Sequence, residues 1–183
     1  MADELRALNL KPAWIVITHS DPDHVGSANE LKALTGAKIC APTAERGYLE
    51  RTERIVPLFR RAVGWIMLSR QAPPDIDRWL EPGDAVADLQ VLATPGHTPG
   101  HIALLSGRTL FAGDAIDTAT ERVRERPGIL TADRVAARRS IEALAALDLD
   151  ACYCGHGPVV HDVSRRLAEL SATWRSPATA PSR

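Results

Sequence analysis

Side chains that can bind metal ions are concentrated in one short stretch of this chain. From position 19 to position 24 the sequence reads His-Ser-Asp-Pro-Asp-His, which places four such side chains within six residues. Imidazole and carboxylate groups suit zinc, iron and manganese. Three later segments, 94–101, 112–114 and 154–157, contain a further His or Asp beside Gly or Pro. The candidate ligands are His19, Asp21, Asp23, His24, His97, Asp114 and His156.

Each of these residues has an ordinary structural explanation when it is considered alone. A single histidine is more often packed or exposed than bound to metal, and residues 21–23 could simply begin a helix, because Asp favours the first turn. We accept that ordinary explanation for His101 and His161. The joint pattern is different, since four of the six histidines and three aspartates fall in loops rich in Gly and Pro. The sequence therefore favours a metal site.

The number of candidate ligands predicts more than one metal ion. Seven ligands exceed the four that a tetrahedral zinc ion uses, and they suit two ions that share a bridging ligand. Asp114 is the natural bridge, because a carboxylate has two oxygen atoms, and Gly113 before it lets the backbone approach closely.

Short strands are predicted just before the candidate ligands. Apolar, β-branched runs bounded by turn residues indicate these strands. Strand ends are rigid, so loops at one edge of a sheet hold ligands at fixed distances, as a metal site requires. The predicted strands are 13–17, 38–41, 89–93, 102–106, 109–112 and 151–154.

Helices are predicted between the strands. Residues 25–34, closed by Gly36, lie between the first two strands and form a βαβ unit with them, which favours a parallel pair. The pattern of helix-forming and apolar residues over 44–70 predicts one or two helices, interrupted near Pro57 and Gly64. Further helices are predicted at 131–147 and 163–174. We expect a single α/β (α+β) domain over residues 1–175, with a helical insertion at about 43–80 and a disordered tail at 176–183.

The composition limits the choice of partner. At 183 residues, with 45% hydrophobic and 25% charged residues, the chain can bury the core of an ordinary globular domain. Its formal net charge of −1 gives no indication of a nucleic-acid partner, and no apolar run is long enough to span a membrane. The first residues lack the apolar segment of a secretory signal, and the three cysteines are an odd number. We therefore expect a cytoplasmic protein with reduced thiols.

These motifs, in this order, resemble the metallo-β-lactamase superfamily, in particular its glyoxalase II-like branch. The first motif of that family is HxHxDH, and its later motifs resemble the segments around His97, Asp114 and His156. The resemblance runs from Trp14 to about His156. It implies an αββα sandwich, and it is specific for the superfamily rather than for one activity.

The resemblance also implies a role for each candidate ligand. His19, Asp21 and His97 would hold one divalent metal ion, and Asp23, His24 and His156 would hold a second. Asp114 would bridge the two ions, and a hydroxide between them would be the nucleophile. Asp23 would orient that hydroxide and pass a proton to the leaving group. Zinc is the metal expected first, with iron or manganese as alternatives.

Two features depart from the family pattern. Asp21 stands where the common motif has histidine, which makes the donor set harder and favours iron or manganese more than usual; the flavodiiron proteins resemble this variant. In addition, His19 follows only 18 residues, whereas family members have several strands before the first motif. We therefore expect a sandwich that lacks some N-terminal strands, in an N-terminally truncated sequence.

Three functions remain open on the sequence. The favoured one is a metal-dependent hydrolase that acts on a small ester, thioester or lactone. The second is an iron-dependent redox enzyme, such as a persulfide dioxygenase or a di-iron protein, and the third is a non-catalytic truncated member. We expect a small-molecule substrate and neither a nucleic-acid nor a membrane partner. The sequence is compatible with a homodimer. Aromatic and other large apolar residues of the 44–80 segment could line a substrate pocket with Arg46 or Arg60, or they could belong to the core: Tyr48, Phe59, Trp65, Met67 and Trp79.

Overall fold

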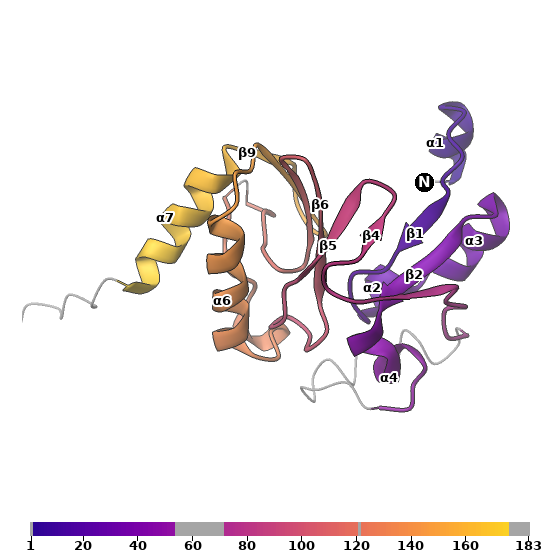
Figure 1. The fold of residues 1–183 in the computed structure, drawn as a ribbon, viewed down its shortest axis with the longest axis horizontal. Coiled ribbons are helices and arrows are strands. Elements are labelled where there is room, and N and C mark those ends of the chain that lie inside the picture. Colours follow the sequence, from indigo (N-terminus) through magenta and orange to yellow (C-terminus); the bar gives the residue numbers. More distant parts are fainter. Residues whose placement is uncertain (1, 54–71, 121, 176–183) are drawn as a thin grey trace, which may run out of the picture.

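The chain folds into four layers, with two sheets face to face in the middle and helices on both outer sides (Figure 1). The structure is a computed structural model that describes residues 2–53, 72–120 and 122–175. It confirms the predicted α/β fold and the αββα arrangement. No helix in these ranges is long and apolar enough to cross a membrane.

The first sheet consists of three parallel strands, β1 (Trp14–Val16), β2 (Lys38–Pro42) and β3 (Arg78–Leu80), in the order β1-β2-β3. Helices α2 (Pro22–Val25) and α3 (Ala28–Thr35) connect β1 to β2, so the predicted βαβ unit is confirmed. Ile17 and Ile39 pack with Val25 and Ala28 of these helices in one buried cluster. Gly36 ends α3 in the left-handed conformation, with φ of 74°, as a C-terminal glycine does.

The second sheet has six strands in the order β4-β5-β6-β7-β8-β9, all antiparallel except the pair β7 and β8. The predicted strands are confirmed, and 89–93, 102–106 and 151–154 have the predicted bounds. The two sheets pack through one buried cluster, in which Cys40 and Leu80 meet Val91 and Ile102. The strands are β4 (Ala85–Val86), β5 (Leu89–Ala93), β6 (Ile102–Ser106), β7 (Thr109–Gly113), β8 (Ala151–Cys154) and β9 (Val160–His161).

Helices α6 (Arg134–Ala145) and α7 (Val163–Arg175) cover the outer face of the second sheet (Figure 1). Leu110 of β7 is fully buried against Ile141 and Leu167 of these helices. Cys152 lies in the same cluster, and all three cysteines are free, so they act as small packed residues. The shorter elements are α1 (Ala2–Ala7), η1 (Thr43–Glu45), α4 (Arg46–Leu49) and η2 (Gly128–Leu130).

The predicted insertion at about 43–80 differs from the structure at its end. Residues 78–80 form a strand, because backbone pairing with β2 stabilises a segment too short for a sequence pattern to reveal. Helix is present at the start of the insertion, in η1 and α4, while 54–71 lie outside the described residues. The predicted tail at 176–183 also lies outside them. The predicted helix 25–34 is mostly α3, with Val25 ending the separate helix α2. The helix predicted at 131–147 is shorter at both ends, and the one predicted at 163–174 begins at the predicted residue and ends one residue later.

Asp133 ties the start of α6 to the rest of the second sheet. Its carboxylate accepts hydrogen bonds from the backbone N–H groups of Val135 and Ala136, at 2.8 and 3.0 Å, and its own N–H donates to the carbonyl of Gly96. We expect Asp133→Ala to lower the free energy of unfolding by about 1 kcal/mol, the usual cost of losing an N-cap side chain. Ser27→Ala is the matched control, since Ser27 precedes α3 without a side-chain cap bond. Equal urea unfolding midpoints for the two variants would contradict the assigned cap.

Candidate metal centre

All seven candidate ligands lie beyond the ends of strands. His19 and Asp21 are in the turn after β1, and Asp23 and His24 are in α2, whose N-cap is Asp21. His97 lies in the loop between β5 and β6, Asp114 directly follows β7, and His156 follows β8. The structure thus brings together residues from both sheets.

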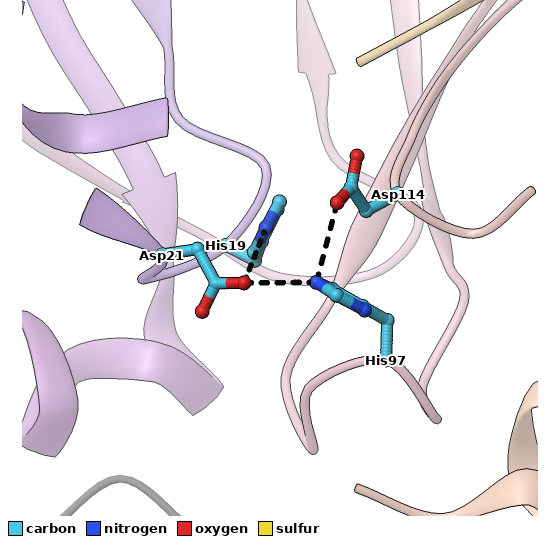
Figure 2. A group of neighbouring side chains, drawn as sticks. All are labelled: His19, Asp21, His97 and Asp114. Carbon is cyan, nitrogen blue, oxygen red and sulfur yellow. Dashed lines mark hydrogen bonds and ion pairs between the residues drawn. The ribbon is translucent and has the colours of Figure 1, made fainter. Parts of the chain in front are cut away.

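Four of these side chains form a first group of possible ligand atoms, His19, Asp21, His97 and Asp114, all within 4.8 Å of one another (Figure 2). The Nε2 atom of His97 lies 3.0 Å from Asp21 Oδ2 and 3.4 Å from Asp114 Oδ2. The Nε2 atom of His19 lies 3.6 Å from the same oxygen of Asp21. Figure 2 shows the two imidazoles and the two carboxylates pointing toward one common point.

The other three side chains, Asp23, His24 and His156, form a second group. The Nε2 atom of His156 lies 3.2 Å from Asp23 Oδ2, and that of His24 lies 3.7 Å from it. Asp114 connects the two groups, since its Oδ1 is 3.4 Å from His24 Nε2 and its Oδ2 is 3.6 Å from His156 Nε2. Its position between the groups is the one that the sequence predicts for a bridging ligand.

The donor set fits a bound cation. Buried nitrogen and oxygen atoms normally have hydrogen-bond partners, yet His19 Nε2, Asp114 Oδ1 and His156 Nε2 are buried and lack one among the described residues. The Nδ1 atom of His19 lies 3.0 Å from Thr18 Oγ1, which leaves Nε2 toward the group. Imidazole nitrogens and carboxylate oxygens that converge in this way can hold a divalent metal ion. That the seven residues bind metal stays a prediction.

Burial keeps the side chains of His19 and His101 neutral. Desolvation lowers the pKa of His19 to about 4, against the opposing effect of the nearby Asp21 carboxylate, and burial lowers the pKa of His101 well below its usual value. A neutral imidazole has a free nitrogen lone pair, which is the form that binds metal. At neutral pH the protein therefore presents His19 in the form a ligand requires.

His101, which the sequence left as an ordinary packed histidine, supports Asp114. The backbone N–H of Asp114 donates to His101 Nε2 at 3.0 Å, so the ring proton is on Nδ1 and donates to Thr94 Oγ1 at 2.7 Å. Both ring nitrogens are engaged, and the side chain is fully buried. His101 thus fixes the backbone of Asp114 without being one of the candidate ligands.

Glu45 is a site residue that sequence reasoning missed. Its fully buried carboxylate accepts a backbone hydrogen bond from Ser20 at 3.0 Å and another from Gly100 at 2.7 Å. One of these residues follows His19 and the other precedes His101, so a single side chain holds the two ligand loops together. A signal was available, because β1 and β2 are parallel and Glu45 lies just past the end of β2, at the same edge as His19.

Two glycines allow the loops to come this close. A Cβ atom added to Gly113, whose φ is 51°, would lie 2.8 Å from His101 Nε2 and 2.9 Å from Thr18 Oγ1. A Cβ atom added to Gly155 would overlap the Asp114 carboxylate and the His24 ring. Each position therefore excludes a side chain for a direct steric reason.

The predicted pocket residues are only partly covered by the structure. Trp79 packs against the core cluster of the first sheet, and the Arg46 guanidinium lies 4.4 Å from its ring centroid. The core explanation therefore holds for Trp79. Tyr48 is half-buried, and the other pocket candidates of that segment lie outside the described residues: Phe59, Arg60, Trp65 and Met67.

Comparison with known proteins identifies the family of this chain. The sequence profile of the metallo-beta-lactamase superfamily matches residues 2–156. The chain belongs to this superfamily. A hydroxyacylglutathione hydrolase of Pseudomonas putida is 36% identical over 126 residues, covering 62% of this chain. The probable metallo-hydrolase YflN of Bacillus subtilis is 29% identical over 177 residues, covering 78% of this chain.

Solved structures of the same superfamily have the same fold. The protein TTHA1623, crystallised in a di-iron-bound form, superposes with a TM-score of 0.69 at 28% identity, covering 87% of this chain and 77% of that one. This chain spans 39% of the length of the P. putida hydrolase and 63% of the length of YflN. The resemblance to a metallohydrolase fold is therefore confirmed, and the substrate is a separate question.

A first prediction for this site concerns the carboxylate of Glu45. In Glu45→Gln the amide NH₂ group would face one of the two backbone donors, so one charge-assisted hydrogen bond is lost and two donors oppose each other. We expect the free energy of unfolding to fall by about 2 kcal/mol and the affinity for divalent metal ions to weaken. Urea unfolding and chelator competition measure the two effects. Glu50→Gln, at an exposed position of the neighbouring turn, is the control and should match the wild type in both.

A second prediction for this site concerns the stability of the protein at acid pH. The unfolded chain takes up protons at His19 and His101 near pH 6.5, whereas the folded protein excludes them until about pH 4 at His19 and well below 6.5 at His101. The free energy of unfolding of the metal-free protein is therefore highest above pH 6.5. It decreases as the pH falls from 6.5 toward 4, by up to about 1.4 kcal/mol per pH unit for each histidine. Urea unfolding in chelator from pH 7.5 to pH 5 tests this. A flat profile would contradict it, and exposed His161→Gln should leave the slope unchanged.

Proposed function

We propose that this protein is a hydrolase that uses two divalent metal ions to cleave a small ester, thioester or lactone. The observation that carries the proposal is the convergence of seven nitrogen and oxygen ligands in two adjoining groups that share Asp114. Membership of a superfamily whose relatives include hydroxyacylglutathione hydrolases supports hydrolysis as the reaction class.

The two groups differ in their access to solvent. The side chains of His19, His97 and Asp114 are at most 2% exposed, whereas those of Asp23 and His156 are 48% and 40% exposed. The first group would hold its metal deep in the fold, and the second would hold the other at the surface. A substrate would therefore reach the centre from the side of Asp23 and His156.

The residues of this chain would then act on a bound substrate by position and proton transfer. Two bound ions would lower the pKa of a water molecule and polarise the carbonyl group. Asp23, the most exposed carboxylate of the centre, would accept a hydrogen bond from that water and deliver a proton to the leaving group. The buried His19 and His97, held by the loops that Glu45 joins, would keep the deep ligands at fixed distances.

The identity of the metal is part of the proposal. Zinc is the first choice for a centre rich in imidazole. Asp21 lies 3.0 Å from His97 Nε2 and contributes an anionic oxygen where the common motif has a nitrogen, which favours a harder ion such as iron or manganese. Elemental analysis of the purified protein, with two equivalents of metal per chain as the expected result, tests both the number and the kind.

Asp21 also supports a second candidate function, an iron-dependent redox enzyme. The structural relative TTHA1623 was crystallised with two iron ions. If the chain binds iron and consumes oxygen in the presence of a persulfide, while model esters and thioesters remain uncleaved, this second function replaces the hydrolase. Absence of any bound metal after reconstitution would instead favour a non-catalytic protein.

Removing central ligands should abolish turnover while leaving the fold in place. We expect His97→Ala and Asp114→Ala each to lower kcat/KM for a model thioester by more than about 100-fold, because even residues outside the ligand shell are worth about 10–100-fold. Circular dichroism should show the wild-type secondary structure. His161→Ala, at the exposed position of β9, is the control. Hydrolysis retained by both ligand variants would overturn the assigned centre.

A further inference from the structure

Arg126 places a positive charge directly beside the candidate metal centre. One guanidinium nitrogen lies 2.8 Å from Asp114 Oδ2, and the other lies 3.6 Å from Asp117 Oδ2. The Arg126 side chain is only 11% exposed, and its Nε atom is buried without a hydrogen-bond partner among the described residues. An arginine in such a position is not a freely solvated surface charge.

The loop that carries Arg126 is fixed on its other side. Glu125 lies between two arginines of α6, with its carboxylate 2.9 Å from Arg134 Nε and 3.1 Å from an Nη atom of Arg138. Asp117 and Arg124 exchange two backbone hydrogen bonds of 2.9 Å, which close the loop. Because these contacts hold the residues around it, Arg126 is directed onto Asp114.

The contact falls on the oxygen that both ligand groups use. Asp114 Oδ2 lies 3.4 Å from His97 Nε2 and 3.6 Å from His156 Nε2, so a metal ion between either imidazole and this oxygen would stand close to the guanidinium. Two cations at such a short distance repel each other. A carboxylate as buried as Asp114 needs a positive partner, and the Arg126 guanidinium is the arginine group that lies against it.

We propose that Arg126 is the internal counter-ion of the metal-free centre and competes with a metal ion for Asp114. When metal binds, the guanidinium shifts its ion pair toward Asp117, which already lies 3.6 Å away. Arg126 thus stabilises the protein before metal arrives and weakens metal binding. This inference rests on the proposed metal centre and assigns Arg126 a positioning role rather than a catalytic one.

Zinc titration of matched variants, by competition with a chromophoric chelator, tests the competition. We expect Arg126→Gln to bind zinc at least about tenfold more tightly than the wild type, because a unit charge close to a divalent ion is removed. The Tm of the metal-free variant should fall by roughly 5–10 °C, since one partner of a buried ion pair is lost. Arg126→Lys keeps the charge and should bind zinc within about threefold of the wild type.

Two further variants sharpen the test. Arg124→Gln makes the same charge change at an exposed position of the same loop and should leave both readouts unchanged. Asp117→Asn removes the second carboxylate, so Arg126 should stay on Asp114 and zinc should bind more weakly. Because Asp117→Asn retains an oxygen for the backbone N–H of Ala119, it keeps the test open if Arg126→Gln does not fold.

The outcomes separate this inference from the proposed function. A wild-type protein that binds no metal would overturn the proposed centre itself. A wild type that binds zinc, together with an Arg126→Gln variant of equal or weaker affinity, or an Asp117→Asn variant of equal or tighter affinity, would overturn only the counter-ion role of Arg126.

Discussion

The structure depends on how the carboxylate of Asp114 is held in a buried position. A hydrogen bond to His101 fixes the backbone of Asp114, and Arg126 balances the charge of its carboxylate. The carboxylate also packs so closely against Gly155 that no side chain fits at position 155. Each constraint comes from a different part of the chain. The carboxylate therefore has little freedom, and the two ligand groups that share it keep a fixed separation.

The centre also joins the two sheets. His19 comes from the first sheet and His97 from the second, and the loops that carry them are held together by Glu45 and by the hydrogen bond from the Ile102 N–H to the Thr18 carbonyl. Any metal ion bound across these loops binds only the folded arrangement, so its binding free energy adds to stability. Folding and metal affinity are thus linked through the same few contacts.

The sequence was sufficient to predict an α/β fold and the convergence of the candidate ligands, because strands and the residues beyond them are local signals, while the αββα arrangement was implied by the resemblance to the superfamily. Apolar runs mark the strands, and His19 or Asp114 stands directly beyond one of them. Arg126 escaped prediction because its ion pairs with Asp114 and Asp117 follow no helical or strand period. Glu45 was missed although its place just past β2 was a signal, because its two backbone partners lie far away in the chain. The strand at 78–80 escaped for the same reason, since only its pairing with β2 defines it.

Asp21 and Arg126 are best understood together. Asp21 adds a negative charge where the common family motif has a neutral imidazole, so the carboxylates of Asp21, Asp23 and Asp114 contribute three charges to a small volume. In water these charges would be screened, but two of the three are largely buried, and their repulsion grows as the local dielectric constant falls. Arg126 places one positive charge beside the carboxylate of Asp114, which both groups share. The added acid and the buried arginine therefore offset each other, and a change at either position shifts the electrostatic balance that governs how strongly a cation is held at the other.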